Sequence, residues 1–139
     1  MSYAIAAALQ TAVFQALATD VALSSLIGGA VYDELPEGIA PDTYVILGAE
    51  TTLDRSDADG DGAEHRLIVS VFSSAGGFSQ GKQAAAAVSD VLHRADLTLS
   101  RGRMVFMTFE KAVAKRDTVS GLRRIDLKFR ARVEDDLIS

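Results

Sequence analysis

The stretch LRRIDLKFRARVED, residues 122–135, contains the most regular β-strand pattern in the chain and decides the class of fold. Charged residues, mostly basic, alternate with a regular apolar set. That set is Ile125, Leu127, Phe129, Ala131 and Val133. Because successive side chains of a strand point to opposite faces, one face of this strand packs and the other meets water or a partner. The pattern predicts a sheet with one buried face.

Further strand patterns precede this one. Residues 43–52, TYVILGAETT, contain a continuous apolar run, which favours burial on both faces. Residues 64–74, EHRLIVSVFSS, alternate, and the two segments flank an Asp/Gly-rich connection, so we expect an antiparallel hairpin. Residues 103–117 predict another strand, and Val31 and Tyr32 indicate a short one.

The other apolar patterns are helical. Residues 3–18 place apolar side chains on one face, and their many alanines allow another element to approach closely. We expect a short helix over 21–27, capped by Asp20, and a long helix over 81–96, for which Ser79 is the candidate N-cap. The predicted fold is α+β: a mostly antiparallel sheet of four to five strands, with the N-terminal helix and the second long helix packed on one face.

The composition excludes several kinds of protein. The chain has 139 residues, the length of one domain, so we expect residues 1–139 to form a single domain. It has no cysteine, which excludes disulfides, thiolate metal sites and cysteine nucleophiles. A formal net charge of −5 disfavours a protein that grips nucleic acid. Residues 1–20 lack the basic start of a signal peptide, and polar residues interrupt their apolar run, so we expect no membrane span.

Residues 54–65, DRSDADGDGAEH, contain the one pattern that suggests a metal site. Three aspartates at alternate positions, followed by Gly62, match the start of a calcium-binding EF-hand loop. The twelfth position requires a bidentate Glu but holds Ile68, and strands rather than helices flank the segment. Asp and Gly are also the residues that long turns favour. We therefore expect no functional metal site and no cofactor.

Other candidate sites have less support. His65 opens a strand beside Glu64, and His93 ends a helix, but no third ligand or nucleophile accompanies either histidine. Residues 76–82, GGFSQGK, lack the spacing of a phosphate-binding loop. We expect no catalytic residue, and an enzyme is the least favoured class.

Two charged surfaces are candidates for contacts with other subunits. The first is the acidic connection with Asp54, Asp57, Asp59, Asp61 and Glu64. The second is the basic face of the last strand, with Arg124, Lys128, Arg130 and Arg132. Opposite charges on one chain favour head-to-tail pairing of copies, and such contacts form rings when the rotation closes. A solvated loop and a strand face whose charges prevent aggregation explain the same patterns without a partner.

The order of the segments resembles a known family. After the Ala-rich helix come VYDELPEG (31–38), PDTYVILGAETTLD (41–54), DGAEHRLIVSVFS (61–73), KQAAAAVSDVLHRADL (82–97) and RRIDLKFRARVE (123–134). This succession is similar to the tail-completion, or tail terminator, proteins of long-tailed phages. It is most similar to the branch encoded by alphaproteobacterial gene transfer agents, which are phage-derived particles. The resemblance covers nearly the whole chain and includes no catalytic signature.

The resemblance implies a structural virion protein at the tail–neck junction of a particle assembled in the bacterial cytoplasm. Members of the family form a ring, usually of six copies, at the head-proximal end of the tail tube. The ring ends tube polymerisation and joins the tail to the neck, and DNA passes through it without specific binding. The implied partners are other copies of the chain, the tail tube protein and a neck or stopper protein. In such a ring, we expect the acidic connection to contact a neighbouring subunit, the tube or the neck.

Two alternatives remain open at this point. The first is a head–tail connector or stopper protein of similar size. The second is a small cytoplasmic oligomeric binding module, in which the acidic connection would be a cation or ligand site.

Overall fold

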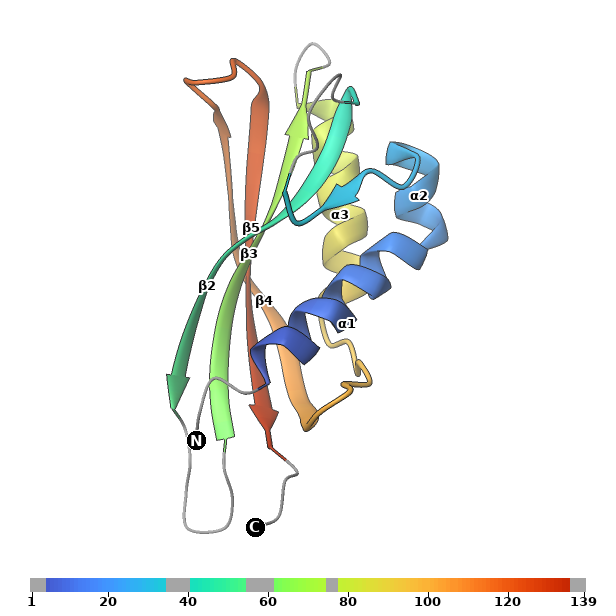
Figure 1. Cartoon of the computed structure of the whole chain (residues 1–139). Helices are drawn as coiled ribbons and strands as arrows, with labels where there is room; N and C mark the ends of the chain where they lie inside the picture. The colour runs from blue at the N-terminus through green and yellow to red at the C-terminus, as the bar shows by residue number, and fades with distance from the viewer. Residues whose placement is uncertain (1–4, 35–40, 55–61, 75–77, 136–139) are drawn as a thin grey trace.

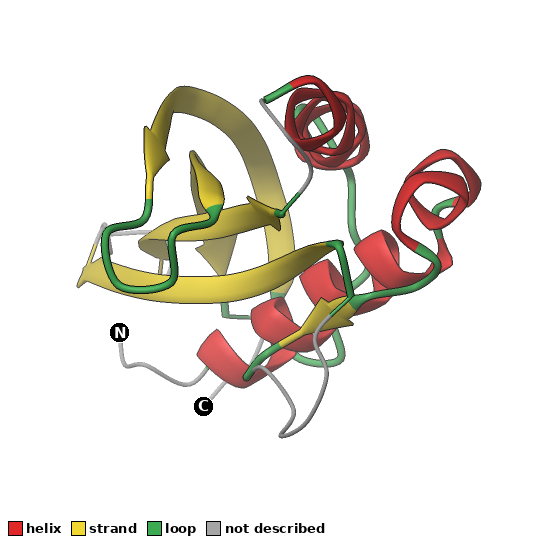
Figure 2. Cartoon of the chain, turned by 90° about the horizontal axis from the view of Figure 1, so that it is seen from above, coloured by secondary structure: helices red, strands yellow, loops and turns green. Residues whose placement is uncertain are grey.

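A computed structural model describes residues 5–34, 41–54, 62–74 and 78–135. Its elements, in chain order, are α1 (Ala6–Thr19), α2 (Val21–Ile27), β1 (Val31–Tyr32), β2 (Thr43–Asp54), β3 (Gly62–Ser73), α3 (Ser79–Leu92), β4 (Arg103–Arg116) and β5 (Arg123–Glu134). Figure 1 shows the helices on one side of a twisted sheet. Seen from above in Figure 2, the opposite face carries no helix from the described residues. We call this the outer face.

The strand order in the sheet is β1-β2-β3-β5-β4. The pairs β2–β3, β3–β5 and β4–β5 are antiparallel, whereas the short β1 runs parallel to β2. The hairpin predicted from the two strands that flank the acidic connection is therefore present. The predicted α+β class, with a mostly antiparallel sheet and helices on one face, is confirmed.

The core lies between the sheet and the helices. All five alternating apolar residues of β5 are buried, as the pattern predicted. The apolar run at the start of β2 is buried only in part: Tyr44 and Val45 are buried, whereas Ile46 and Leu47 are half-buried. The prediction that this run is buried on both faces is wrong for Ile46 and Leu47. Ile46 lies beside Ser70 in the register, on the face without helices.

A β-bulge interrupts the pairing of β2 with β3. Leu47 lies opposite Val69, and the next registered pair is Glu50 with Leu67, so three steps on β2 match two on β3. A Cβ at Gly48 would lie 3.1 Å from the carbonyl oxygen of Ile68, which leaves little room for a larger residue. Because the extra residue reverses the alternation, Glu50 points to the helix side of the sheet.

The boundaries of both long helices differ from the predicted ones: α1 spans Ala6–Thr19 rather than residues 3–18, and α3 spans Ser79–Leu92 rather than residues 81–96. Asp20 caps α2 as expected, since its Oδ2 accepts a hydrogen bond of 2.9 Å from the backbone N–H of Leu23. Ser79 is the first residue of α3 rather than its N-cap; Phe78 takes that position and makes no side-chain cap bond. The helix ends at Leu92, not at residue 96, because Arg94 adopts a positive φ and its N–H donates to the carbonyl of Met107 on β4.

In the described ranges, no helix is long and apolar enough to cross a membrane alone. α1 and α2 meet that condition only as a pair, and they are bent by 72° relative to each other. The apolar side of α1 is buried in the core, which explains its composition.

We expect Gly102→Ala to destabilise the fold far more than Gly121→Ala. Both glycines have a left-handed φ, of 74° and 75°, so the backbone strain from a side chain is nearly equal, about 1 kcal/mol. A Cβ at Gly102 would also lie 2.5 Å from the Glu134 carbonyl oxygen and 2.7 Å from the Ile5 side chain. Gly121 has nothing within 4 Å. Urea denaturation should show an additional loss of about 1–3 kcal/mol for Gly102→Ala, and equal losses would contradict this packing.

Candidate functional site

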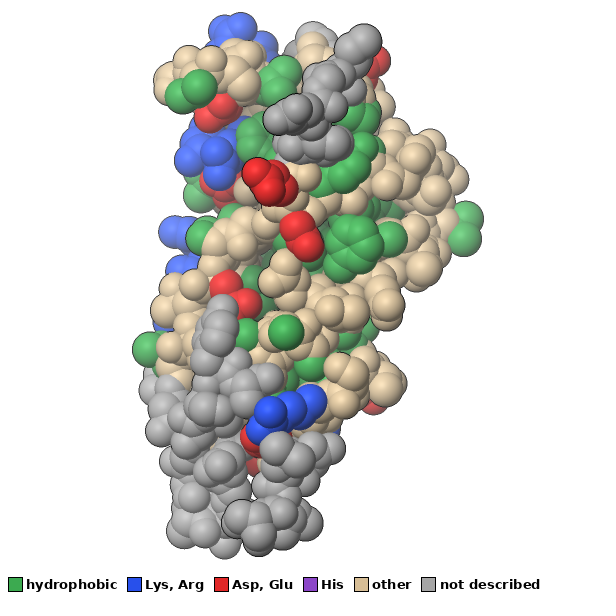
Figure 3. All heavy atoms as spheres, in the orientation of Figure 1, with side chains coloured by type: hydrophobic (Ala, Val, Ile, Leu, Met, Phe, Trp, Pro, Cys, Tyr) green, Lys and Arg blue, Asp and Glu red, His purple; other side chains and the backbone are tan. Residues whose placement is uncertain are grey.

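The outer face of the sheet carries the basic residues that the sequence identified on the last strand. They are Arg124, Lys128, Arg130 and Arg132, which alternate with the buried apolar residues of β5 and are themselves half-buried. Figure 3 shows Lys and Arg side chains gathered along the flank of the molecule drawn at left. The predicted basic surface therefore exists, and its role in contacting a partner stays a prediction.

Glu64 links the two charged surfaces that the sequence presented as separate. It lies inside β3 rather than in the connection before it, and only 7% of its surface is exposed. Its carboxylate lies 3.4 Å from Nε of Arg130 on β5 and 3.6 Å from Arg66 on its own strand. Arg66 also lies 3.4 Å from Glu110 of β4. These contacts form an ion-pair network across three strands, which orders the outer face internally.

A second cluster on the outer face is centred on Asp126. Its carboxylate accepts hydrogen bonds from Ser70 at 2.6 Å and from Nε of Arg124 at 2.8 Å, and Lys115 lies 3.4 Å away. Burial raises the pKa of Asp126, but the hydrogen bonds from Ser70 and Arg124 and the nearby positive charges outweigh it and hold that pKa below its usual range. The guanidinium of Arg124 also lies over the ring of Phe72. Asp126 is therefore a charged anchor between three strands.

Two lysines of this face have no such partner among the described residues. Lys111 on β4 lies directly opposite Lys128 on β5 in the strand register. Neither lysine forms an ion pair with any described residue, whereas Arg66, Lys115 and Arg130 all do. Like charges placed directly opposite each other repel. The pair therefore forms a local excess of positive charge on the outer face.

Both histidines have structural roles. His65 is fully buried on the helix side of the sheet, and its Nδ1 lies 3.1 Å from Glu50 and 3.2 Å from the hydroxyl of Thr52. Nδ1 of His93 accepts a hydrogen bond of 3.0 Å from the backbone N–H of Phe109, which joins the end of α3 to β4. Within the described ranges, no three His, Asp or Glu side chains are grouped so as to hold a metal ion.

The sequence reasoning missed the contact between Glu50 and His65. It depends on the bulge in β2, which turns Glu50 to the same face as His65. An isolated glycine inside a strand pattern, here Gly48, was the available signal for that bulge.

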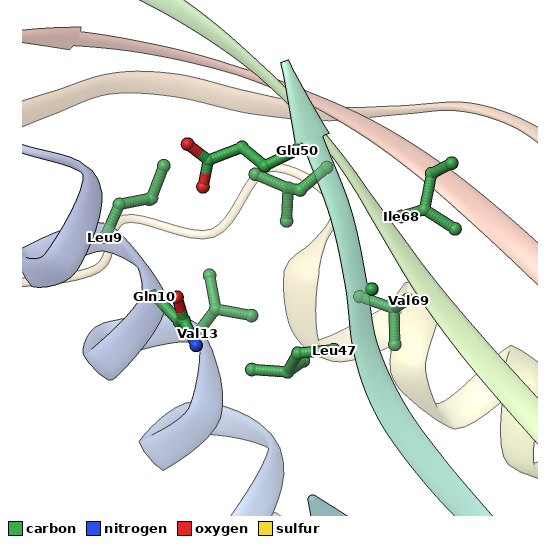
Figure 4. A pocket seen from close by; sticks show the side chains of 9 residues that line it. Leu9, Gln10, Val13, Leu47, Glu50, Ile68 and Val69 are labelled. Atoms are coloured by element: carbon green, nitrogen blue, oxygen red, sulfur yellow. The ribbon is translucent and has the colours of Figure 1, made fainter. Parts of the chain in front are cut away.

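A small cavity lies between α1 and the bulged part of the sheet. Figure 4 shows Leu9 and Val13 of α1 facing Leu47 and Val69, with Glu50 above them. Its volume is about 30 Å³, enough for about one water molecule. Substrate pockets are about ten times larger, so this cavity does not provide a site for a small-molecule substrate.

The remaining candidate residues of the acidic connection lie at the end of β2 or after it. Asp54 ends β2, where its backbone pairs with Ala63. Asp57, Asp59 and Asp61 lie outside the described residues. Their role as a contact surface stays a prediction.

Comparisons with known proteins identify relatives over most of the chain. A model of the family described as tail completion protein gp17 matches residues 11–134. A chain in a solved structure described as the virion of a native gene transfer agent particle is 54% identical, with a TM-score of 0.90. The match covers 96% of this chain and 99% of that chain. No curated protein matches. These findings confirm the resemblance predicted from the sequence.

We expect Asp126 to stabilise the fold in a pH-dependent way. Because its folded-state pKa is lowered, its contribution is present above the unfolded-state value of about 3.9 and is lost as the pH falls through the lower folded value. The variant Asp126→Asn should be less stable than the parent at pH 6, and the difference should narrow by pH 3. Urea midpoints at both pH values measure this. Asp90→Asn, at an exposed position of α3, removes the same charge and should leave the pH dependence nearly unchanged.

Proposed function

The chain belongs to the tail completion protein gp17 family, and on this basis we propose that it is the tail terminator of a gene transfer agent particle. It is a structural protein of a phage-like tail. In this proposal, copies of the chain form a ring, of six subunits by analogy with the family, at the head-proximal end of the tail tube. The ring ends polymerisation of the tube protein and presents a surface to a neck or stopper protein.

The observation that carries the proposal is the similarity to a chain of a gene transfer agent virion over nearly the full length of both chains. An identity of 54% with no large difference in covered length favours the same position in a similar particle. The described surface agrees with an assembly role. The cavity between α1 and the bulged part of the sheet is too small for a substrate, and a structural role requires none.

The proposal includes passage of DNA through the ring without specific binding. Tight binding of the phosphates would oppose movement of DNA. Such binding requires Lys or Arg side chains that are free to replace the counterions of the DNA. Arg66, Arg124 and Arg130 on the outer face already have carboxylate partners within the chain. The net charge of −5 acts in the same direction, because it repels phosphates at long range.

Electron microscopy of particles from a strain without this chain tests the proposal. A missing terminator should give tails that are overlong or unattached to heads, because nothing ends tube growth or joins the tube to the neck. Tails of normal length beside unjoined heads would instead assign the chain to the connector or stopper position. Normal, filled and joined particles would contradict both roles.

The acidic connection is part of the proposed contact surface with a neighbouring subunit, the tube or the neck. Loops carried by a rigid sheet commonly make such contacts. Deletion of Asp57 to Asp61 should leave a folded chain, as judged by circular dichroism and a cooperative thermal transition, but reduce the fraction of particles with joined tails. A deletion variant that restores normal tails in the null strain would refute this role for the connection.

A further inference from the structure

Charge is distributed very unevenly along this chain. Residues 1–54 contain seven Asp and Glu but no Lys or Arg. Residues 101–132 contain ten Lys and Arg and three Asp and Glu. The net charge of −5 therefore conceals an acidic first part and a basic last part.

The fold places these two parts at opposite edges of the sheet. Described residues before position 55 form α1, α2, β1 and β2, and the basic part forms β4 and most of β5. In the order β1-β2-β3-β5-β4, the acidic part lies at one end and the basic part at the other. With neighbouring strands about 4.8 Å apart, β1 and β4 are separated by roughly 19 Å along the sheet. Within one copy, the described residues of the two parts approach each other near the ends of β4, where Ile5 lies beside Gly102 and Asp117 lies within electrostatic range of Tyr44. A contact between the middle of β4 and the residues beside β1 would therefore join two copies of the chain.

The basic edge also has exposed apolar side chains. Of the five large hydrophobic side chains exposed in the described ranges, four lie on β4 or in the turn after it: Val105, Phe109, Val113 and Val119. Lys111, whose ammonium has no ion-pair partner among the described residues, lies between Phe109 and Val113 in the sequence. Apolar groups beside unpaired cations suit an acidic protein surface that also offers apolar contact.

The acidic edge provides such a surface. Asp33, Glu34 and Asp42 are exposed there, beside β1 and the start of β2. Asp33 also lines an open hollow of about 390 Å³ on α1. Its lining residues are Ala7, Gln10, Thr11, Phe14, Gln15 and Asp33. The hollow has room for several aliphatic side chains, and the carboxylate of Asp33 lies at it.

We infer that the β4 edge of one copy docks on the α1–β1–β2 edge of the next copy. The inference rests on the proposed ring and identifies the surfaces that form it. Because the two surfaces differ, a pair of copies still has one free edge of each kind after a single contact, so the contact propagates until a ring closes. Two β4 edges facing each other would bring their cations together, which disfavours a symmetric dimer. DNA is the less favoured occupant, because Glu64, Glu110 and Asp126 already bind outer-face cations.

Zero-length coupling of amines to carboxylates in purified particles tests this contact. Denaturing gels should show multimers of this chain, and peptides from their bands should join Lys111 or Lys115 to Asp33, Glu34 or Asp42. A link found in the multimer bands and absent from the band of the single chain joins two copies. Multimers without any link between the two edges would overturn the inference and leave the proposed ring intact.

The variant Lys111→Glu provides a second test with opposite effects on the subunit and on the assembly. It places a carboxylate opposite Lys128, so the thermal midpoint of the isolated chain should rise or stay unchanged. In particles, the yield of edge-to-edge links through Lys115 should fall by about tenfold, because like charges then face each other across the contact. Lys82→Glu on α3 changes the charge equally, away from both edges, and should keep the parental yield.

Particles with Lys111→Glu that keep the parental yield of links would overturn the inference. The null strain separates this outcome from failure of the proposed function. Suppose that the null strain gives overlong or unattached tails while Lys111→Glu particles keep the parental yield of edge-to-edge links. This result would support the terminator function and reject the contact between the two edges. Normal particles in the null strain would reject the terminator itself.

Discussion

The pairing of β3 with β5 is the constraint on which the rest of the structure depends. Twelve residues of each strand, from Gly62 opposite Glu134 to Ser73 opposite Arg123, pair without a shift in register. This regular ladder fixes which side chains enter the core, since a slip by one residue would exchange the two faces. It also brings Glu64 to Arg130 and Ser70 to Asp126 on the outer face. The buried face and the charged face are thus two results of one register.

The flanking strands depart from this regularity, and their irregularities position specific groups. The bulge of β2 turns Glu50 inward to His65, and β4 has register shifts near Phe106 and Lys111. Each bulge bends its strand and increases the local twist. At β4, bulges and lysines blunt an edge that would otherwise pair with any exposed strand. Contacts at the β4 edge therefore depend on charge and shape and not on backbone hydrogen bonds alone.

Much of the fold follows from the sequence because local patterns determine it. The alternation in β5 predicted its buried residues, and the Asp20 cap followed from the residue type at a helix start. Features that depend on distant partners did not follow. The end of α3 at Leu92 depends on a hydrogen bond between Arg94 and Met107 of β4. The pairing of Glu64 with Arg130 requires the register of strands that are far apart in the sequence. The acidic first part and the basic last part of the chain are visible in the sequence. That they lie at opposite edges of the sheet depends on the strand order, which the sequence does not show.

The position of β5 has a consequence for synthesis of the chain. It is the last strand in the sequence, yet it lies inside the sheet between β3 and β4. Until the ribosome has released residues 123–134, β3 has an unpaired edge, and β4 has no neighbour to hold it. The β3–β5 and β4–β5 pairings therefore form only after residues 123–134 have left the ribosome, so they are the last pairings of the described sheet to form. During that interval, the open edge of β3 is the part of the nascent chain most exposed to incorrect pairing with other chains.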